Sequence, residues 1–403
     1  MKIAMIDFIR EAKIYFDYTQ KLRRDFHTYP ELGYQEIRTA GIVTNELHKL
    51  GLEVTSGVAK TGVVALLKCR TPGPVVLLRF DMDALPIGEE TGAVYASQNP
   101  GIMHACGHDG HSAIGLTVAR LLHKHRNELV GTVKFIFQPA EEGLCGAERG
   151  GAEQMVLEGV LENPRPDRAL ALHLWNEKPL GWIGISNGPA MAGAEEFKIL
   201  IKGKGGHGAI PNLCIDPILA ASQIVISLQS IVSRNDSSLQ SAVVSVTMIH
   251  GGDAFNVIPP EVILQGTIRT FELSVRENVL KRFDEIVRGT SEAMGCQVDI
   301  TIKRLSPAVI NDAGTACFVQ SIAHRIFPDA VISTADYITM GAEDMAFFLE
   351  KIPGCYIFIG SSNPGKGLDT GHHHPSFDFD EQALITGAAL IAASAAEMLT
   401  TVD

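Results

Sequence analysis

The sequence predicts an α/β fold, in which a mostly parallel sheet flanked by helices is interrupted by an inserted α+β domain of ferredoxin-like type. Over residues 1–186, helical patterns alternate with short runs that are apolar throughout, as is typical of parallel strands buried on both faces. Between residues 187 and 303 the order becomes strand, helix, strand, strand, helix, strand. Residues 304–403 return to the first pattern. We therefore predict a discontinuous main domain, 1–186 with 304–403, and an inserted lid domain, 187–303.

The elements of the main domain follow from periodicity. Spacing typical of amphipathic helices extends over 8–26, 39–50 and 112–125, and after the insertion over 313–326, 343–349 and 381–398. Runs rich in Val, Leu, Ile and Phe predict strands at 63–67, 75–80, 133–137, 169–174, 182–185 and 356–359. Since helices and strands alternate, the helices should cover the faces of the sheet.

The inserted domain begins with a strand at 197–202, where apolar and mostly polar residues alternate. Asp216 and Pro217 then supply an N-cap and a proline at the first helical position. The predicted apolar face of this helix consists of Ile218, Ala221, Val225, Leu228 and Val232. Strands at 242–249 and 262–270, a helix around Phe283 and a last strand at 298–302 complete the split βαβ arrangement.

Composition excludes several classes of protein. The net charge of −12 would repel a phosphate backbone, so we expect no nucleic-acid partner. The longest apolar stretches, such as 388–396, are far shorter than the ~20 residues of a bilayer-spanning helix, and acidic residues interrupt the N-terminus. The seven cysteines form no CxxC spacing. We expect a cytoplasmic protein with reduced thiols and no membrane partner.

The window His104-Ala-Cys-Gly-His-Asp-Gly-His111 predicts a transition-metal site. It places nitrogen, sulfur and carboxylate donors at the start of a helix, in backbone that glycines allow to bend. Cys106 is the favoured ligand because a thiolate next to a dication is readily deprotonated and can bridge two ions. His108 is the second. His104 and His111 are either ligands or residues that orient and cap the site.

The window Gln138-Pro-Ala-Glu-Glu-Gly143 follows the strand 133–137 and predicts hydrolytic chemistry. Metal-assisted hydrolysis needs an ion that lowers the pKa of water and polarises a carbonyl, together with an uncoordinated base that accepts a proton. Adjacent side chains at a strand end diverge, so one carboxylate can bind a metal while its neighbour serves as the base. We assign Glu141 as the base and Glu142 as a ligand.

Three further segments supply candidate groups. Asp81 and Asp83 follow the strand 75–80, and a carboxylate commonly hydrogen-bonds a ligand histidine. His173 ends another apolar strand, where a lone histidine is more often structural than a ligand, and one of His372 to His374 near the C-terminus is a further candidate. Ligands of open α/β sheets gather at the carboxyl ends of strands, so these segments should converge with Cys106 and Glu142.

The lid carries three candidate groups for the substrate. His207, in the glycine-rich turn 203–211, could donate a hydrogen bond to a developing oxyanion, or it could be a surface turn residue. Asn256 offers an amide. Arg269 offers a guanidinium suited to a substrate carboxylate, or it could form a surface salt bridge. By alternation, Arg269 should share a strand face with Gln265 and Thr267.

These motifs together resemble the aminoacylase and carboxypeptidase family of two-metal amidohydrolases. Within it, the chain is similar to the branch of hippurate hydrolases, N-acyl-amino-acid amidohydrolases and plant hydrolases of auxin-amino-acid conjugates. The matching strings are Arg24-Asp-Phe-His-Thr-Tyr-Pro-Glu-Leu-Gly33, Asp81-Met-Asp-Ala-Leu-Pro86, His104-Ala-Cys-Gly-His-Asp-Gly-His111, Gln138-Pro-Ala-Glu-Glu-Gly143, Gly205-Gly-His-Gly-Ala209, Asn256-Val-Ile-Pro259 and His373-His-Pro375.

The resemblance implies specific roles. The ligands of two divalent ions would be Cys106, His108, Glu142, His173 and His373, with Zn or Mn expected and Co or Ni also compatible with a mixed N, O, S site. Glu141 would be the general base, and Asp83 would orient the ligands. The lid would mediate dimerisation, and its His207 would support the oxyanion in a neighbouring subunit. Asn256 and Arg269 would contact the substrate.

We therefore expect a metal-dependent amidohydrolase that cleaves the amide bond of N-acyl or N-aroyl amino acids, and a homodimer or higher homo-oligomer. One alternative is a metallo-dipeptidase or carboxypeptidase that acts on substrates with a free amine. Another is a non-catalytic binding protein, which would be expected to have lost the base or a ligand.

Overall fold

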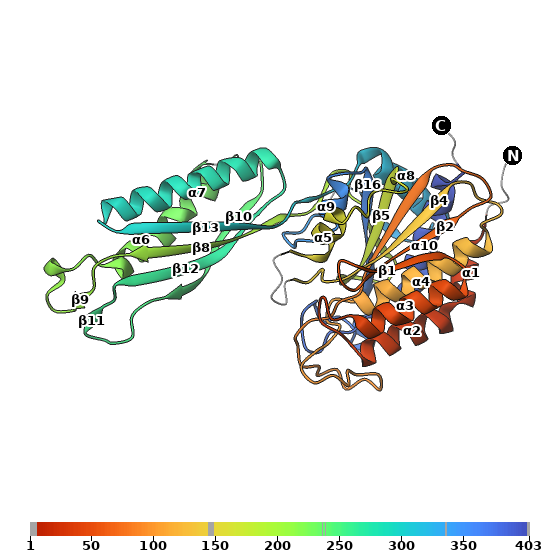
Figure 1. Cartoon of the computed structure of the whole chain (residues 1–403), viewed down its shortest axis with the longest axis horizontal. Helices are drawn as coiled ribbons and strands as arrows, with labels where there is room; N and C mark the ends of the chain where they lie inside the picture. Colours follow the sequence, from red (N-terminus) through yellow and green to blue (C-terminus); the bar gives the residue numbers. More distant parts are fainter. Residues whose placement is uncertain (1–5, 144–148, 236, 238, 335–336, 401–403) are drawn as a thin grey trace. The chain divides into compact units, whose positions relative to one another are not determined.

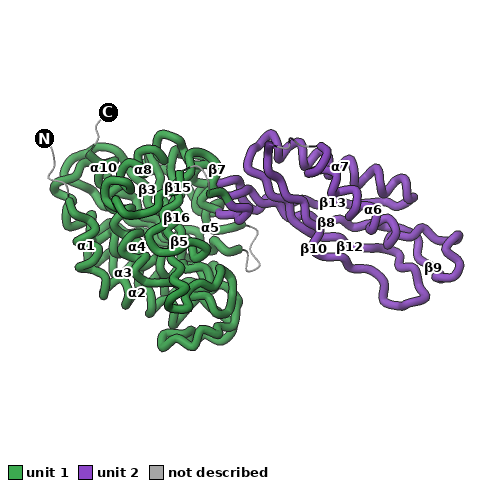
Figure 2. The backbone as a smooth tube through the Cα atoms, turned by 180° about the vertical axis from the view of Figure 1, so that it is seen from behind, with its two compact units in different colours: residues 1–190, 310–338, 344–403 green, residues 191–309, 339–343 purple. Residues whose placement is uncertain are grey.

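The computed structural model describes residues 6–143, 149–235, 237, 239–334 and 337–400. The chain forms two compact units, drawn in green and purple in Figure 2. Unit 1 comprises residues 1–190, 310–338 and 344–403, and unit 2 comprises residues 191–309 and 339–343. Each unit has a separate hydrophobic core. The sequence placed the boundaries of the insertion at 187 and 303, and it gave no sign that 339–343 would join unit 2.

Unit 1 is built on one eight-stranded sheet (Figure 1). In spatial order its strands are β1 (Glu53–Val58), β2 (Gly62–Lys68), β4 (Thr132–Gln138), β3 (Val75–Asp81), β5 (Arg168–Pro179), β16 (Gly354–Ser362), β6 (Trp182–Gly184) and β15 (Val331–Ser333). The four central strands, β4, β3, β5 and β16, are parallel to one another. The predicted parallel sheet is therefore confirmed in its centre, whereas β1 with β2, β2 with β4 and β16 with β6 pair antiparallel.

Helices surround this sheet. They are α1 (Phe8–Ile14), α2 (Phe16–Thr28), α3 (Ile37–Lys49), α4 (His108–Lys124), α5 (Gly151–Leu157), α8 (Ala313–Ile326), α9 (Ala346–Leu349) and α10 (Ala383–Met398). Nearly every residue of α4 and α10 is buried, and both helices contact each other and the central strands. Their small residues allow this close approach. A Cβ on Gly115 of α4 would lie 2.6 Å from the Phe80 ring, so only glycine fits there.

Some predicted elements were wrong in extent. The single helix predicted at 8–26 is two helices that meet at Tyr15, because periodicity detects a shared buried face but not a break between two helices that both use it. The helix predicted at 343–349 is limited to α9, since the Asp344 carboxylate is bonded to Arg79 and Gln138 rather than to a helix N-terminus of its own. Neither β1 nor α5 was predicted.

Unit 2 has the predicted ferredoxin-like arrangement. Its sheet has the order β10 (Ala242–His250), β12 (Glu261–Thr270), β8 (Gly193–Lys202), β13 (Gln297–Ser306), and all neighbours are antiparallel. The helices α6 (Pro217–Ser230) and α7 (Leu273–Ala293) contact each other and the sheet. The short strands β9 (Gly206–His207) and β11 (Val257–Ile258) pair beyond the sheet, whereas β7 (Pro189–Met191) pairs with β14 (Val309–Ile310).

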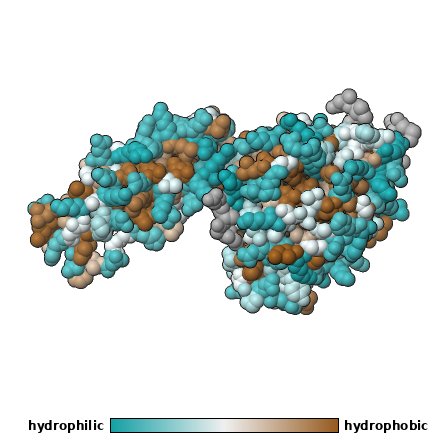
Figure 3. All heavy atoms as spheres, in the orientation of Figure 1, coloured by the Kyte–Doolittle hydropathy of each residue, from teal (hydrophilic) through white to brown (hydrophobic). Residues whose placement is uncertain are grey.

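The predicted buried face of α6 was correct for Ala221 and Leu228 and wrong for Ile218 and Val232. Ala220, Ala221, Ile224 and Leu228 are buried, whereas Ile218 is 44% exposed and Val232, just past the end of α6, is 40% exposed. The helix is apolar on more than one side, so periodicity alone could not show which side meets the sheet. Apolar surface is also visible in Figure 3 at the end of unit 2 that carries β9, where Ile210 and Leu213 are exposed.

Within the described residues, no helix combines the length and the apolar character that crossing a bilayer requires.

Candidate metal centre

The centre is built around the start of α4. Gly107, with φ +91°, turns the chain into the helix in a conformation that favours glycine. Gly110 lies so close to β5 that an added Cβ would be 2.5 Å from Leu174. Because of these two glycines, the side chains of Cys106, His108 and His111 are enclosed by the ends of the central strands.

The structure separates the roles of the three histidines in this window. His111 Nδ1 donates to Asp81 Oδ1 at 2.6 Å, and its Nε2 accepts from the Leu174 N–H at 2.9 Å, so neither nitrogen is open. His104 is buried, and burial lowers its pKa to about 4, but it lies in none of the donor clusters among the described residues. His108 alone of the three has an open nitrogen beside other donors.

Two groups of donor atoms share Cys106. One group is Cys106, His108 and His173, and the other is Cys106, Glu142 and His373; within each group the donor atoms lie within 4.8 Å of one another. Cys106 Sγ lies 3.4 Å from His173 Nε2, and His373 Nε2 lies 3.2 Å from Glu142 Oε1. The arrangement can hold two ions that share the sulfur.

Hydrogen bonds orient the two buried imidazoles. His108 Nδ1 donates to the Asp83 backbone oxygen at 3.0 Å, and His173 Nδ1 donates to the Leu174 oxygen at 2.7 Å. Each bond leaves the lone pair on Nε2 facing the other donors. Asp83 therefore orients His108 mainly through its backbone, while its carboxylate accepts the Glu142 N–H at 2.9 Å.

The centre contains buried acceptors that the protein does not satisfy. Among the described residues, His108 Nε2 is buried and has no hydrogen-bond partner. Glu142 Oε1 and Asp83 Oδ1 are also buried and make no well-aligned hydrogen bond, although they lie 3.2 Å from His373 Nε2 and 3.3 Å from His108 Nδ1. An unpaired buried acceptor is costly, and a cation at this position would satisfy several at once. The residues therefore fit a pair of divalent ions.

The electrostatics of the centre agree with this. Burial favours a neutral imidazole, but the Asp81 and Asp83 carboxylates raise the pKa of His108 to about 10. Burial and the Glu142 and Glu141 carboxylates raise the pKa of the Cys106 thiol well above its usual value. The carboxylates contribute to both shifts, and divalent cations would neutralise their negative charge.

The two adjacent glutamates occupy different positions. Ala140 just before them has φ +49°, which turns the chain at the end of β4. Glu142 belongs to the group with Cys106 and His373. Glu141 approaches His108 Nε2 at 3.9 Å and belongs to neither group that contains Cys106. It forms two other donor groups, one with His108 and Glu142 and one with Glu343 and Asp344.

The structure distinguishes the three consecutive histidines. His373 is in the donor group, with φ +62° and its N–H donating to the Ala105 oxygen at 2.8 Å. His372 lies between the Trp175 and Phe377 rings, and its Nε2 accepts the N–H of Asn176 at 3.1 Å. His374 is exposed and its Nδ1 accepts the N–H of Ser376.

The candidate residues of unit 2 fall into two places. His207 on β9 and Asn256 just before β11 are exposed neighbours, since the Gly208 N–H donates to the Asn256 oxygen at 2.8 Å. Arg269 lies near the opposite end of β12, facing Ala194, and shares its less buried face with Gln265 and Thr267 as predicted. Burial lowers the pKa of Arg269, and its Nη1 is buried with no hydrogen-bond partner in the described part of the chain.

Sequence reasoning missed Arg79, which is fully buried at the end of β3. It donates to Asp81 Oδ2 at 2.6 Å, to Gln138 Oε1 at 2.8 Å and to Asp344 Oδ1 at 2.9 Å. It therefore joins the carboxylate that orients His111 to the end of β4. An arginine inside the apolar run 75–80 was the signal that could have revealed it.

Comparisons with known proteins agree with this centre. Residues 77–397 match the profile of Peptidase family M20/M25/M40. N-acetylcysteine deacetylase of Bacillus subtilis is 41% identical over 382 residues, covering 94% of this chain and 97% of that protein. IAA-amino acid hydrolase ILR1-like 4 of Arabidopsis thaliana is 39% identical over 393 residues, covering 96% and 86%. A crystal structure of a Bacillus subtilis protein, described as a dinuclear metal binding peptidase from the M20 family, covers 97% of this chain and 100% of that one, with 36% identity and a TM-score of 0.82.

These matches confirm the predicted class of metal-dependent amidohydrolase and a pair of divalent ions as its cofactor. The profile covers most of the chain, and the relatives align over nearly all of it. The chain belongs to Peptidase family M20/M25/M40.

Proposed function

We propose that the chain hydrolyses the amide bond of N-acyl and N-aroyl amino acids, with two divalent cations held by Cys106, His108, Glu142, His173 and His373. The observation that carries this proposal is the pair of donor groups that share Cys106, with Glu141 beside them but in neither. We propose Zn or Mn as the ions, because both accept mixed nitrogen, oxygen and sulfur ligands; Co and Ni also fit this donor set.

When bound, the cations would supply positive charge that polarises the substrate carbonyl and lowers the pKa of water. Glu141 then accepts a proton from the attacking water and delivers it to the nitrogen of the leaving amino acid. Asp83 keeps the Glu142 backbone and the His108 ring in place for this step. His207 donates a hydrogen bond to the oxyanion, and Asn256 and Arg269 contact the amino-acid part of the substrate.

The substrate class is supported by the two relatives above, whose names describe hydrolysis of N-acetylcysteine and of an amino-acid conjugate of IAA. In both, an acyl group is joined to the nitrogen of an amino acid. Hippurate-like and acetyl-amino-acid amides share this linkage and differ in the size of the acyl group.

The test is a panel of acetyl-amino acids, hippurate and free dipeptides, assayed with the Mn- and Zn-loaded protein and with Glu141→Gln. The wild type should release free amino acids from the acyl substrates, and Glu141→Gln should retain both ions by elemental analysis while its turnover falls about 10²- to 10⁴-fold. Faster cleavage of free dipeptides would favour the dipeptidase alternative. Loss of an ion from Glu141→Gln would show that Glu141 is a ligand and contradict the proposed mechanism.

We further propose that the protein is a cytoplasmic homodimer in which unit 2 serves as lid and dimerisation domain. The exposed apolar residues of α6 support this, because a helix buried on one side rarely exposes large apolar residues on another without a partner. They are Ile218, Leu219 and Ile226. Light scattering on the wild type and on Ile226→Glu tests the interface; the variant should be monomeric.

A further inference from the structure

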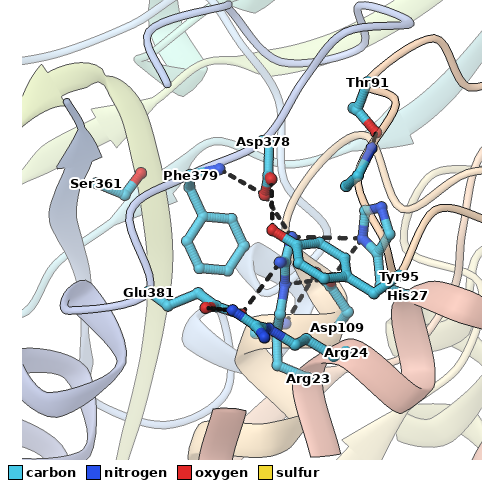
Figure 4. A network of polar contacts seen from close by, with 12 residues as sticks. Arg23, Arg24, His27, Thr91, Tyr95, Asp109, Ser361, Asp378, Phe379 and Glu381 are labelled. Carbon is cyan, nitrogen blue, oxygen red and sulfur yellow. Dashed lines mark hydrogen bonds and ion pairs between the residues drawn. The ribbon is translucent and has the colours of Figure 1, made fainter. Parts of the chain in front are cut away.

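The N-terminal motif that begins at Arg24 contributes no donor to the metal centre, yet its neighbour Arg23 is one of the most buried charges in unit 1. Arg23 lies on α2 and is 0% exposed. Figure 4 shows its guanidinium among carboxylates that come from distant parts of the chain. A buried charge in such a cluster is kept only where geometry and pairing offset the cost of desolvation.

Arg23 joins two segments that each carry a metal donor. Its Nε donates to Asp109 Oδ2 at 2.9 Å, and its Nη2 donates to Asp378 Oδ1 at 2.6 Å. Asp109 directly follows His108 at the start of α4. Asp378 lies in the loop that follows His373.

Both carboxylates are held by further bonds. Asp109 Oδ2 also accepts from His27 Nδ1 at 2.7 Å, and its Oδ1 accepts the Gly110 N–H at 2.9 Å. Asp378 Oδ2 accepts from the Tyr95 hydroxyl at 2.8 Å. The positions of both carboxylates relative to α2 are therefore fixed.

The guanidinium itself is confined on both faces. It lies over the Tyr95 ring at 4.8 Å and over the Phe379 ring at 4.4 Å. A planar guanidinium packed against two rings can donate hydrogen bonds in two fixed directions at once. A lysine ammonium in the same space cannot do this.

The charged anchors of the loop with His373 lie at its far end. They are Asp378, which accepts from Arg23 and Tyr95, and Glu381, which accepts from Arg24 and, at 3.3 Å, from Arg23 Nη1. Nearer to His373, its backbone contacts are weaker. Its contacts include the His373 N–H to the Ala105 oxygen, and the Pro375 and Asp378 oxygens, which accept from the Glu90 N–H and from Asn176 Nδ2. These are bonds between neutral groups, whereas the Arg23 to Asp378 bond is charge-assisted and roughly twice as strong.

We infer that Arg23 is a positioning residue of the metal centre: by clamping Asp109 and Asp378 it fixes the His108 segment against the His373 loop, so that both ions bind tightly. This inference rests on the proposed function, because it concerns the ligands assigned there. The ion that depends on His373 should be weakened first, since Asp378 is the charged anchor nearest to His373 and loses its guanidinium partner when Arg23 is changed.

The experiment is a calorimetric titration of metal-free full-length protein with Mn²⁺, for the wild type, Arg23→Lys, Asp378→Asn and Arg24→Lys. Arg24 is the matched control: it neighbours Arg23 on α2 and binds Glu381, but it bonds neither Asp109 nor Asp378 in the described structure. We expect the wild type and Arg24→Lys to bind two ions alike. Arg23→Lys and Asp378→Asn should bind one of the two at least about tenfold more weakly.

Thermal unfolding of each metal-free protein separates positioning from stability. If the unfolding temperature falls while both dissociation constants stay at the wild-type values, Arg23 is structural only and the inference is overturned. If Arg23→Lys does not fold, the dissociation constants of Asp378→Asn decide the question in the same way. A wild type that fails to bind two ions overturns the proposed function, whereas unchanged affinities in the variants overturn this inference alone.

Discussion

Two buried polar regions of unit 1 differ in whether other protein groups provide hydrogen-bond partners for their polar atoms. In the metal centre, His108 Nε2 is buried without a hydrogen-bond partner among the described residues, and Glu142 Oε1 has only the His373 imidazole beside it, at 3.2 Å. On β4, the Lys134 ammonium is equally buried, but it donates to three carbonyl oxygens, those of Val160, Glu162 and Pro164, at 2.7–2.8 Å. The first region requires a ligand from outside, and the second is complete without one. Unsatisfied acceptors thus separate a functional cluster from a structural one more clearly than burial or charge does.

The largest effect is expected when the sulfur atom that both donor groups of the metal centre share is removed. Cys106→Ala removes the only sulfur common to both donor groups, so both ions should be lost and turnover should fall by about 10³-fold or more. Elemental analysis and an amide-hydrolysis assay measure this. Cys355→Ala is the control, because Cys355 is also fully buried in unit 1 and should leave two ions bound. Two ions retained by Cys106→Ala would refute the shared site.

Single-ligand variants sharpen the same assignment. His173→Ala should weaken the ion of the group with His108, and His373→Ala the ion of the group with Glu142, because each histidine belongs to only one of these groups. Each variant should therefore retain close to one ion, as measured by elemental analysis after dialysis. If both variants lose both ions, the two positions do not bind independently.

The sequence signals for the candidate donors are local, whereas those for their surroundings are not. The donors Cys106 and His108, and the pair Glu141 and Glu142, could be found because each follows a glycine-rich turn or a strand end, and such signals are local. Spacing alone could not choose His373 among three consecutive histidines, and only the family resemblance pointed to it, since backbone conformation and neighbouring rings decide which imidazole reaches the donors. Arg23 was not singled out because its partners lie far along the chain.

The same limit applies to the fold. The central parallel strands are continuous apolar runs, which sequence reveals directly, and the ferredoxin-like order follows from element succession. The buried face of α6 was predicted only in part, because several of its sides are apolar and tertiary packing selects the one that is buried. The segment 339–343 joins unit 2 by contacts that leave no periodic pattern in so few residues.

The region around Lys134 is tested by replacing this lysine, whose ammonium group binds the three carbonyl oxygens. Burial lowers the pKa of Lys134 to about 8, so the ammonium is still protonated at neutral pH. Lys134→Met leaves three buried carbonyl oxygens without their donor, and the free energy of unfolding should fall by about 3 kcal/mol. Urea unfolding measures this. Lys68→Met on β2, where the side chain is 70% exposed, should change stability by less than about 0.5 kcal/mol.

The metal content of Lys134→Met shows whether the region around Lys134 also contributes to the metal centre. If Lys134→Met folds with two ions bound, the satisfied region serves stability and not the site. If instead the ions are lost while stability is unchanged, the distinction between the two regions is wrong.

The smallest expected effect concerns Glu36. Its own hydrogen bonds are complete, but it lies near the Asp83 carboxylate of the metal centre. The Glu36 carboxylate accepts from the Ala140 N–H at 2.8 Å and from the Thr61 hydroxyl at 2.5 Å, so its hydrogen bonds are satisfied. Burial and the nearby Asp83 charge nonetheless raise the pKa of Glu36 to about 7. Because this folded-state pKa lies above that of the unfolded chain, the folded protein binds more protons between these two values, and stability is lost as pH rises through 7.

Glu36→Gln mimics the protonated acid, since its amide oxygen can accept from Ala140 and its amide nitrogen can donate to Thr61. Between pH 5 and 7.5 the unfolding free energy of the metal-free wild type should decrease. The decrease in the metal-free variant should be smaller by about 2 kcal/mol. Urea unfolding at both pH values measures the difference, with the exposed Glu53→Gln as a control of equal charge change. Adding Mn²⁺ to the wild type should shrink the same decrease, because cations beside Asp83 offset the charge that raises the pKa of Glu36. If Glu36→Gln and the wild type show the same pH dependence of stability, the pKa of Glu36 is not raised in the folded protein and this prediction is wrong.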